Sequence, residues 1–174
     1  SINEIELVEL DAWILNEARR LNEEIIEDYS NYESHLAFQK ILNFCSNELG
    51  SFYLDIIKDR LYTSRKKGQA RVSAQIVMQK ILLSLLSWVS PILSFTAEEA
   101  FKELKQDIPS IFLSGWYQDW IDYDFSLDEE TWSFLVNLKV DVNKLLEDKR
   151  NSGEIGSSLD AEVKIYCNSE NFLR

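Results

Sequence analysis

The sequence predicts a mainly α-helical protein, an antiparallel helical bundle followed by a small C-terminal appendage of one helix and one strand. Glycine and proline together number seven among 174 residues, which is few for a turn-rich β fold. Apolar residues recur at helical spacing along most of the chain, and three Ser/Thr-x-x-Glu sequences are typical of helix starts. We therefore expect a bundle over residues 1–125 and a C-terminal junction segment over residues 126–174.

Three long helices are predicted in the first half of the chain. The first ends near Tyr29, and a capping box at residues 30–33 opens the second, which ends near Tyr62. The third covers residues 69–90 and is apolar on almost every side, so we expect it at the centre of the bundle and not in a membrane. Six apolar residues of the second helix are spaced to form a seam against its neighbours: Phe38, Leu42, Cys45, Leu49, Phe52 and Ile56.

Shorter elements of secondary structure are predicted in the second half of the chain. A capping box at residues 96–99 opens a helix to about Lys105, and residues 109–123 are aromatic and irregular. A third capping box at residues 126–129 opens a helix to about Arg150. The acidic pairs in these two boxes are explained by the positive end of a helix dipole. Alternating apolar residues predict one strand over residues 161–167.

Charge is distributed unevenly along the chain. The net charge is −12, which argues against a uniformly basic nucleic-acid-binding surface. Residues 55–71, however, hold six basic and two acidic side chains, a local balance of +4 that leaves −16 for the rest. Two interpretations stay open for this stretch, a solvated loop between helices or a site that binds phosphate groups.

The sequence does not nominate a catalytic residue. It contains no glycine loop for phosphate, no Ser/His/Asp set and no cluster of metal ligands. Cys45 and Cys167 are far apart, and Cys45 is expected to be a buried free thiol in a reducing, cytoplasmic setting. The single histidine, His35, is expected to be structural or exposed. The chain begins at Ser1 without a signal sequence, which suggests a piece of a larger protein.

Four stretches, in the same order along the chain, resemble the anticodon-binding region of isoleucyl-tRNA synthetases. They are LDAWILN at residues 10–16, NFCSNEL with SFYLDIIKDRLY at 43–62, SAQ with SPILSFTAEE at 73–99, and IGSSLDA at 155–161. The related valyl and leucyl enzymes share the bundle and the segment around Pro91. The string from Phe52 to Tyr62 is the feature that favours the isoleucyl family.

The resemblance implies a bundle of the class I synthetase anticodon-binding type that binds isoleucine-specific tRNA at its anticodon stem–loop. The parent enzyme would use ATP and magnesium, with zinc possible in a C-terminal module outside this chain, and would be monomeric. This chain has neither a HIGH-like nor a KMSKS-like signature, so we expect no catalysis and no cofactor within it. The residues expected to contact tRNA are Lys58, Arg60, Tyr62, Arg65, Lys66, Lys67, Arg71 and Asn16.

Alternatives to these assignments remain open. Lys58 and Arg60 could pair with Asp55 and Asp59, and Tyr62 could be a packed helix end. Ala12 and Ala18 stand where the family often has arginine, which weakens an RNA-binding role for the first helix. The chain as a whole could instead be a protein-interaction module that uses aromatic residues near Trp116 and Trp120, a free-standing relative, or the same domain of a valyl-type enzyme.

Overall fold

The computed structural model describes residues 7–104 and 106–166, and nearly all of their regular structure is helical. The chain divides into two compact units, Ser1–Ser126 and Leu127–Arg174. The predicted mainly α fold is confirmed. We describe each unit separately.

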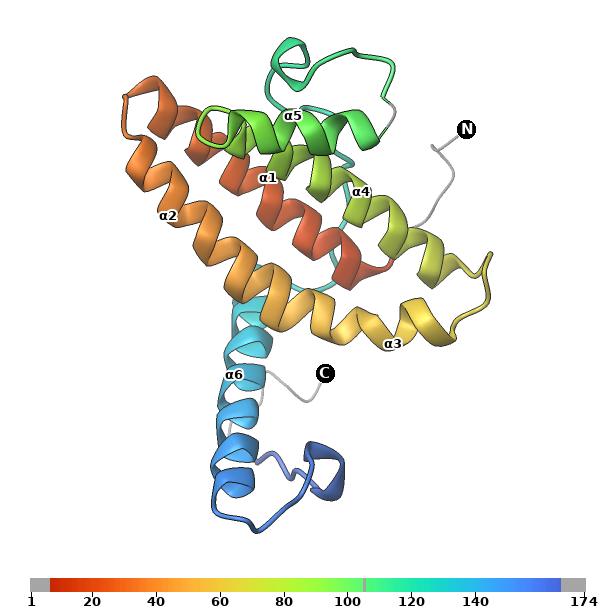
Figure 1. Ribbon diagram of the computed structural model, residues 1–174. Coiled ribbons are helices and arrows are strands. Elements are labelled where there is room, and N and C mark those ends of the chain that lie inside the picture. The colour runs from red at the N-terminus through yellow and green to blue at the C-terminus, as the bar shows by residue number, and fades with distance from the viewer. Residues whose placement is uncertain (1–6, 105, 167–174) are drawn as a thin grey trace. The chain divides into compact units, whose positions relative to one another are not determined.

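The first unit is a bundle whose long elements are α1 (Glu9–Ser30), α2 (Ser34–Phe44), the π-helical segment η2 (Cys45–Leu54), α3 (Asp55–Thr63), α4 (Gln69–Val89) and α5 (Ser94–Glu103). In this bundle α2, η2 and α3 follow one another as one continuous helical run, antiparallel to α1 on one side of the sequence and to α4 on the other (Figure 1). α4 contacts α1, α2, α3 and α5, as well as the short 3₁₀ turn η3 (Ile111–Leu113), which confirms the central place predicted for the third helix. By length and composition α4 could also cross a membrane, but half of its most apolar stretch is buried, as in the core helix of a soluble protein.

The helices begin at other residues than the capping boxes predict. α1 continues through Ser30, whose hydroxyl donates to the carbonyl of Ile26 (2.7 Å), and Tyr32 turns the chain with a φ of 61° before α2 begins. α5 begins at Ser94, two residues before the predicted box. The cap of α6 is Asp128, which accepts from the backbone N–H of Thr131 (2.8 Å). A Ser-x-x-Glu spacing is too short to fix a helix start when its side chains have stronger partners elsewhere.

Two residues within the predicted capping boxes, Glu98 and Ser126, instead hold other parts of the bundle. The Glu98 carboxylate accepts from the Ser110 hydroxyl (2.9 Å) and the Ile111 N–H (3.1 Å), so it caps η3 and not its own helix. These hydrogen bonds, led by that from Ser110, hold the pKa of Glu98 below its usual value. Ser126 donates its backbone N–H to Glu9 (2.9 Å) at the start of α1. Both contacts join segments far apart in the sequence.

The predicted seam of the second helix is only partly buried: Phe52 is buried as predicted, Cys45 and Leu49 are half-buried, and the other three seam residues are exposed. Phe38, Leu42 and Ile56 are 39%, 44% and 39% exposed, and their neighbours on the chain are buried instead. The buried residues are Ala37, Ile41, Phe44, Phe52, Tyr53 and Ile57. Apolar residues occur in adjacent pairs along this helix, so periodicity alone cannot select the inner member of each pair. The π-helical segment also shifts the phase of the buried face after residue 44.

Gly50 lies within the π-helical segment, and its lack of a side chain is required there. A Cβ atom at this position would lie 2.7 Å from the carbonyl oxygen of Cys45, which belongs to the backbone and cannot rotate away. Insertion of one residue into a helix commonly produces such wide turns. Ser51 also has its partner five residues earlier, because its hydroxyl donates to the carbonyl of Ser46 (2.6 Å).

An irregular segment after η3 runs back along the bundle and is tied to it by side chains. Lys80 of α4 is 7% exposed and pairs with Asp119 (2.5 Å). Arg19 of α1 pairs with Asp122 (2.7 Å). Trp116 of the same segment stacks on Tyr29 of α1, so both polar and aromatic side chains hold it to the helices.

The second unit consists of α6 (Glu129–Asn151) and the 3₁₀ turn η4 (Ser158–Asp160), which contacts it. Trp132 on α6 is buried, as are Trp13 and Trp88 in the first unit. The predicted strand is wrong for residues 161–166, which form no regular element. A strand needs a hydrogen-bonded partner, and this part of the described chain provides none. Cys167 lies outside the described residues.

Replacing Gly50 with alanine should destabilise the first unit by about 1–3 kcal/mol, because the new Cβ would push against the Cys45 carbonyl. Urea unfolding followed by circular dichroism measures the change. Ser46→Ala, at an exposed position of the same segment, is the matched control and should change stability by less than about 0.5 kcal/mol. Equal stabilities for the two variants would show that the wide turn does not need glycine.

Candidate nucleic-acid interface

The link between α3 and α4 carries the exposed part of the basic stretch. We call Tyr62, Arg65, Lys66 and Lys67 the basic tip. The Gly68 N–H donates to the carbonyl of Arg65 (2.9 Å), which closes a tight turn over these residues and starts α4. Tyr62 is 86% exposed, so it is not a packed helix end, and the three cations beside it are exposed too. Within the described residues, none of these three cations forms an ion pair.

The other cations of the stretch have partners in the protein. Lys58 pairs with Asp55 one turn earlier on α3 (2.7 Å), as one of the alternatives expects. Arg71 donates from Nη1 to the carbonyl of Leu61 and so ties α4 to the end of α3. Arg60 pairs with Asp11 of α1 and not with Asp59. Asn16 lies on α1 and is half-buried, apart in sequence from the other predicted residues.

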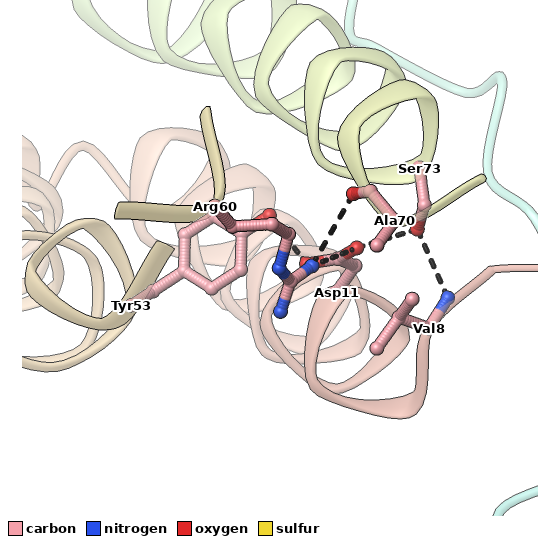
Figure 2. A network of polar contacts seen from close by, with 6 residues as sticks. All are labelled: Val8, Asp11, Tyr53, Arg60, Ala70 and Ser73. Carbon is pink, nitrogen blue, oxygen red and sulfur yellow. Dashed lines mark hydrogen bonds and ion pairs between the residues drawn. The ribbon is translucent and has the colours of Figure 1, made fainter. Parts of the chain in front are cut away.

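Asp11 is the centre of a polar network that joins α1, η2, α3 and α4 (Figure 2). Its side chain is fully buried, and donors from three other segments surround it. Arg60 of α3 donates from Nη1 to both carboxylate oxygens (2.9 and 2.8 Å). Tyr53 of η2 donates to Oδ1 (2.9 Å), and Ser73 of α4 donates to Oδ2 (2.5 Å). These four hydrogen bonds use the acceptor capacity of one carboxylate.

Two further contacts extend the network to the backbone at the start of α1 and α4. The hydroxyl of Ser73 accepts the backbone N–H of Val8 (2.9 Å), just before α1 begins. Arg60 also donates to the carbonyl of Ala70 in the first turn of α4 (3.4 Å). The network therefore joins the beginning of α1, the beginning of α4 and the end of α3 at one place.

Sequence reasoning missed Asp11, Tyr53 and Ser73 as members of a shared site. One signal was present, because Asp11 interrupts the apolar residues that open the first helix. A carboxylate on an apolar helix face is rarely buried unless it has a partner. The sequence does not identify that partner, since Arg60 lies 49 positions away.

Burial raises the pKa of the Tyr53 hydroxyl well above its usual value, and the nearby negative charge of Asp11 raises it further. The neutral phenol is the form that donates to the carboxylate. An ionised Tyr53 would face Asp11 with a second negative charge in a buried position.

Other candidate sites in the described residues are weaker. Trp116 stacks on Tyr29 (ring centroids 5.5 Å apart) and Trp120 packs edge-on against Tyr117 (4.9 Å), so these rings are engaged within the bundle. Cys45 is a free thiol that is half-buried, and burial raises its pKa. No group of three or more His, Cys, Asp or Glu side chains in the described part of the chain is arranged to hold a metal ion.

The family match and the similar known proteins agree with each other. Residues 11–165 match the family described as the anticodon-binding domain of tRNA ligase. An isoleucine–tRNA ligase of Legionella pneumophila (strain Corby) is 46% identical over 166 residues, covering 95% of this chain and 18% of the relative. Isoleucine–tRNA ligases of Coxiella burnetii (strain RSA 331 / Henzerling II) and Shewanella sp. (strain ANA-3) are 45% and 44% identical, each again covered over 18% of its length.

Replacing Arg60 with glutamine should destabilise the first unit by about 3–5 kcal/mol, because the buried Asp11 carboxylate would lose its compensating charge. Urea unfolding measures the change. Lys58→Gln is the matched control on the same helix. Its ion pair with Asp55 is exposed on both sides, so its loss should have no measurable effect. A loss for Arg60→Gln no larger than that for Lys58→Gln would contradict the role given to the network.

Raising the pH above about 10 should weaken the fold through Tyr53. The folded-state pKa lies above the unfolded value, so this contribution is complete below pH about 10 and is lost as pH rises toward the folded-state pKa. Each pH unit in that window costs about 1.4 kcal/mol per tyrosine. Tyr53→Phe should remove this part of the pH dependence, so the stability difference between the two proteins should narrow between pH 10 and 11.5. A constant difference across that range would contradict the prediction.

Proposed function

The chain belongs to the anticodon-binding domain family of tRNA ligases, and from this premise we propose that it binds the anticodon stem–loop of a tRNA through the basic tip. The observation that carries the proposal is the turn of three consecutive exposed cations, Arg65, Lys66 and Lys67. They have no ion-pair partner among the described residues, whereas Lys58 and Arg60 do. A protein of net charge −12 that leaves three cations together on one turn presents a site for an anion.

The residue types of the basic tip suit a single-stranded loop of RNA. Arginine and lysine contact phosphate oxygens, and an arginine plane or an aromatic ring can stack on an unpaired base. Tyr62 is the aromatic residue of the tip, and its ring is almost fully accessible. We propose phosphate contacts for Arg65, Lys66 and Lys67 and base stacking for Tyr62. Lys58, one turn before Tyr62 on α3, is proposed to reach the same strand by exchanging Asp55 for a phosphate.

The remaining predicted contacts are proposed to play smaller parts. Arg71 is held by the Leu61 carbonyl, so we assign it to the shape of the tip before RNA contact. Asn16 is half-buried on α1, where Ala12 and Ala18 are buried and add no polar group. We therefore propose that α1 supports the tip and adds at most one polar contact.

The proposal extends to the whole protein as follows. The relatives are isoleucine–tRNA ligases, and this chain spans about a fifth of their length. We propose that the chain is the tRNA-positioning part of such a ligase, which attaches isoleucine to its tRNA with ATP. Catalysis, ATP and magnesium are assigned to regions outside this chain. A cytoplasmic, monomeric enzyme is our expectation.

Replacing Arg65, Lys66 and Lys67 together with alanine should weaken binding of an isoleucine tRNA anticodon stem–loop by at least tenfold. Fluorescence anisotropy across a salt series measures the affinity. The slope of log affinity against log salt should also fall by about 2, since each lost phosphate contact to a single strand contributes about 0.7. Tyr62→Ala should weaken binding less and leave the slope unchanged.

Lys102→Gln is the control for a lost surface cation, because Lys102 lies on α5 and pairs with Glu98. The affinity of the Lys102→Gln variant, and its slope of log affinity against log salt, should match those of the unmodified chain. An unchanged affinity in the triple variant would refute the proposed contact at the tip. A stem–loop from a tRNA of another amino acid, measured in parallel, separates general RNA affinity from preference for isoleucine tRNA.

A further inference from the structure

Arg60 lies at the base of the basic tip and not on its surface. Its side chain is 18% exposed, and its guanidinium is directed inward to Asp11, as Figure 2 shows. The basic tip begins two residues later, at Tyr62. The Arg60 Nη1 group donates to both Asp11 oxygens and to the Ala70 carbonyl, so this end of the guanidinium is committed to partners inside the protein.

Both ends of the link that carries the basic tip are fixed to the same carboxylate. On the α3 side the fixing group is Arg60, and on the α4 side it is Ser73, whose hydroxyl donates to Asp11. Arg71 adds a brace across the link through the Leu61 carbonyl. Any sliding of α3 against α4 would break one of these contacts, so the network sets the distance and angle between the two ends of the turn.

We infer that Asp11 and Arg60 are positioning residues for RNA binding: their ion pair orients the basic tip, and the Arg60 guanidinium does not contact RNA. The inference rests on the proposed function, since it concerns the same site. Asp11, a buried acidic residue, thus supports the binding of RNA without contacting it.

The two possible roles of Arg60 predict opposite effects at Asp11. If Arg60 contacts RNA, Asp11→Asn removes a competing negative charge and frees the guanidinium, so affinity should stay the same or increase. If the ion pair positions the tip, Asp11→Asn should weaken binding although it makes the protein less acidic. Asparagine has nearly the same shape as aspartate, so this variant disturbs packing little.

The experiment measures anisotropy with the same isoleucine tRNA stem–loop for Asp11→Asn, Arg60→Gln and the double variant of the 174-residue chain. Conditions are chosen from urea curves so that every variant is folded. We expect each single variant to weaken binding about tenfold and the double variant to bind no more weakly than either single one, because both remove one shared interaction. Arg60→Lys should recover only part of the loss, since lysine keeps the positive charge but differs from arginine in reach and hydrogen-bond geometry.

Three results would overturn the inference. Unchanged or tighter binding in Asp11→Asn with weaker binding in Arg60→Gln would show a direct Arg60 contact. Unchanged affinity in both folded variants would show that the pair only stabilises the fold, and additive losses would show independent roles. Failure of the proposed function gives a different result, in which the triple variant of Arg65, Lys66 and Lys67 itself binds normally.

A milder variant keeps the inference testable if Arg60→Gln does not fold. Ser73→Ala removes one donor from Asp11 and the brace to Val8, but it leaves the ion pair intact. We expect it to weaken binding about twofold to threefold. No change in this variant together with no change in Asp11→Asn would overturn the inference.

Discussion

A carboxylate with no access to water must find its hydrogen bonds within the protein, and in this bundle that requirement falls on Asp11. Burying an unpaired charge costs several kcal/mol, so the folded state is restricted to arrangements that bring donors to it. The donors come from η2, α3 and α4, and each reaches Asp11 only in one register of its helix. Apolar packing holds these helices together, and the carboxylate selects how they are aligned.

The same alignment separates the basic side chains of residues 60–71 into two groups. Arg60 and Arg71 are used inside the protein to hold the corner between α3 and α4. Arg65, Lys66 and Lys67 occupy the turn that these two residues fix, and they remain exposed. An acidic surface elsewhere repels nucleic acid, so the exposed turn is both the attractive point and the one with a defined geometry.

The sequence was sufficient for the existence and order of the helices, because apolar periodicity over long segments is a strong signal. The sequence was insufficient where two different buried faces of a helix fit the same pattern of apolar residues. Ala37 and Phe38 are equally consistent with a buried face, and the choice between them depends on the neighbouring helices. After residue 44 the wide turn at Gly50 also shifts which residues are buried. The basic stretch could be found from the charges in the sequence. The sequence could not show that Arg60 is paired inside the protein whereas Arg65 is exposed, because the partner of Arg60 is Asp11, which is distant in sequence.

Chemical-shift mapping by NMR would show both the surface that RNA contacts and the state of the Asp11 network in one experiment. The isotope-labelled chain would be titrated with the isoleucine tRNA anticodon stem–loop. We expect the largest amide shifts at residues 62–68, with the side-chain signals of Arg60 and Tyr53 retained as in the free protein. Shifts concentrated on α5 and η3, or loss of the Arg60 signal through direct RNA contact, would contradict this expectation.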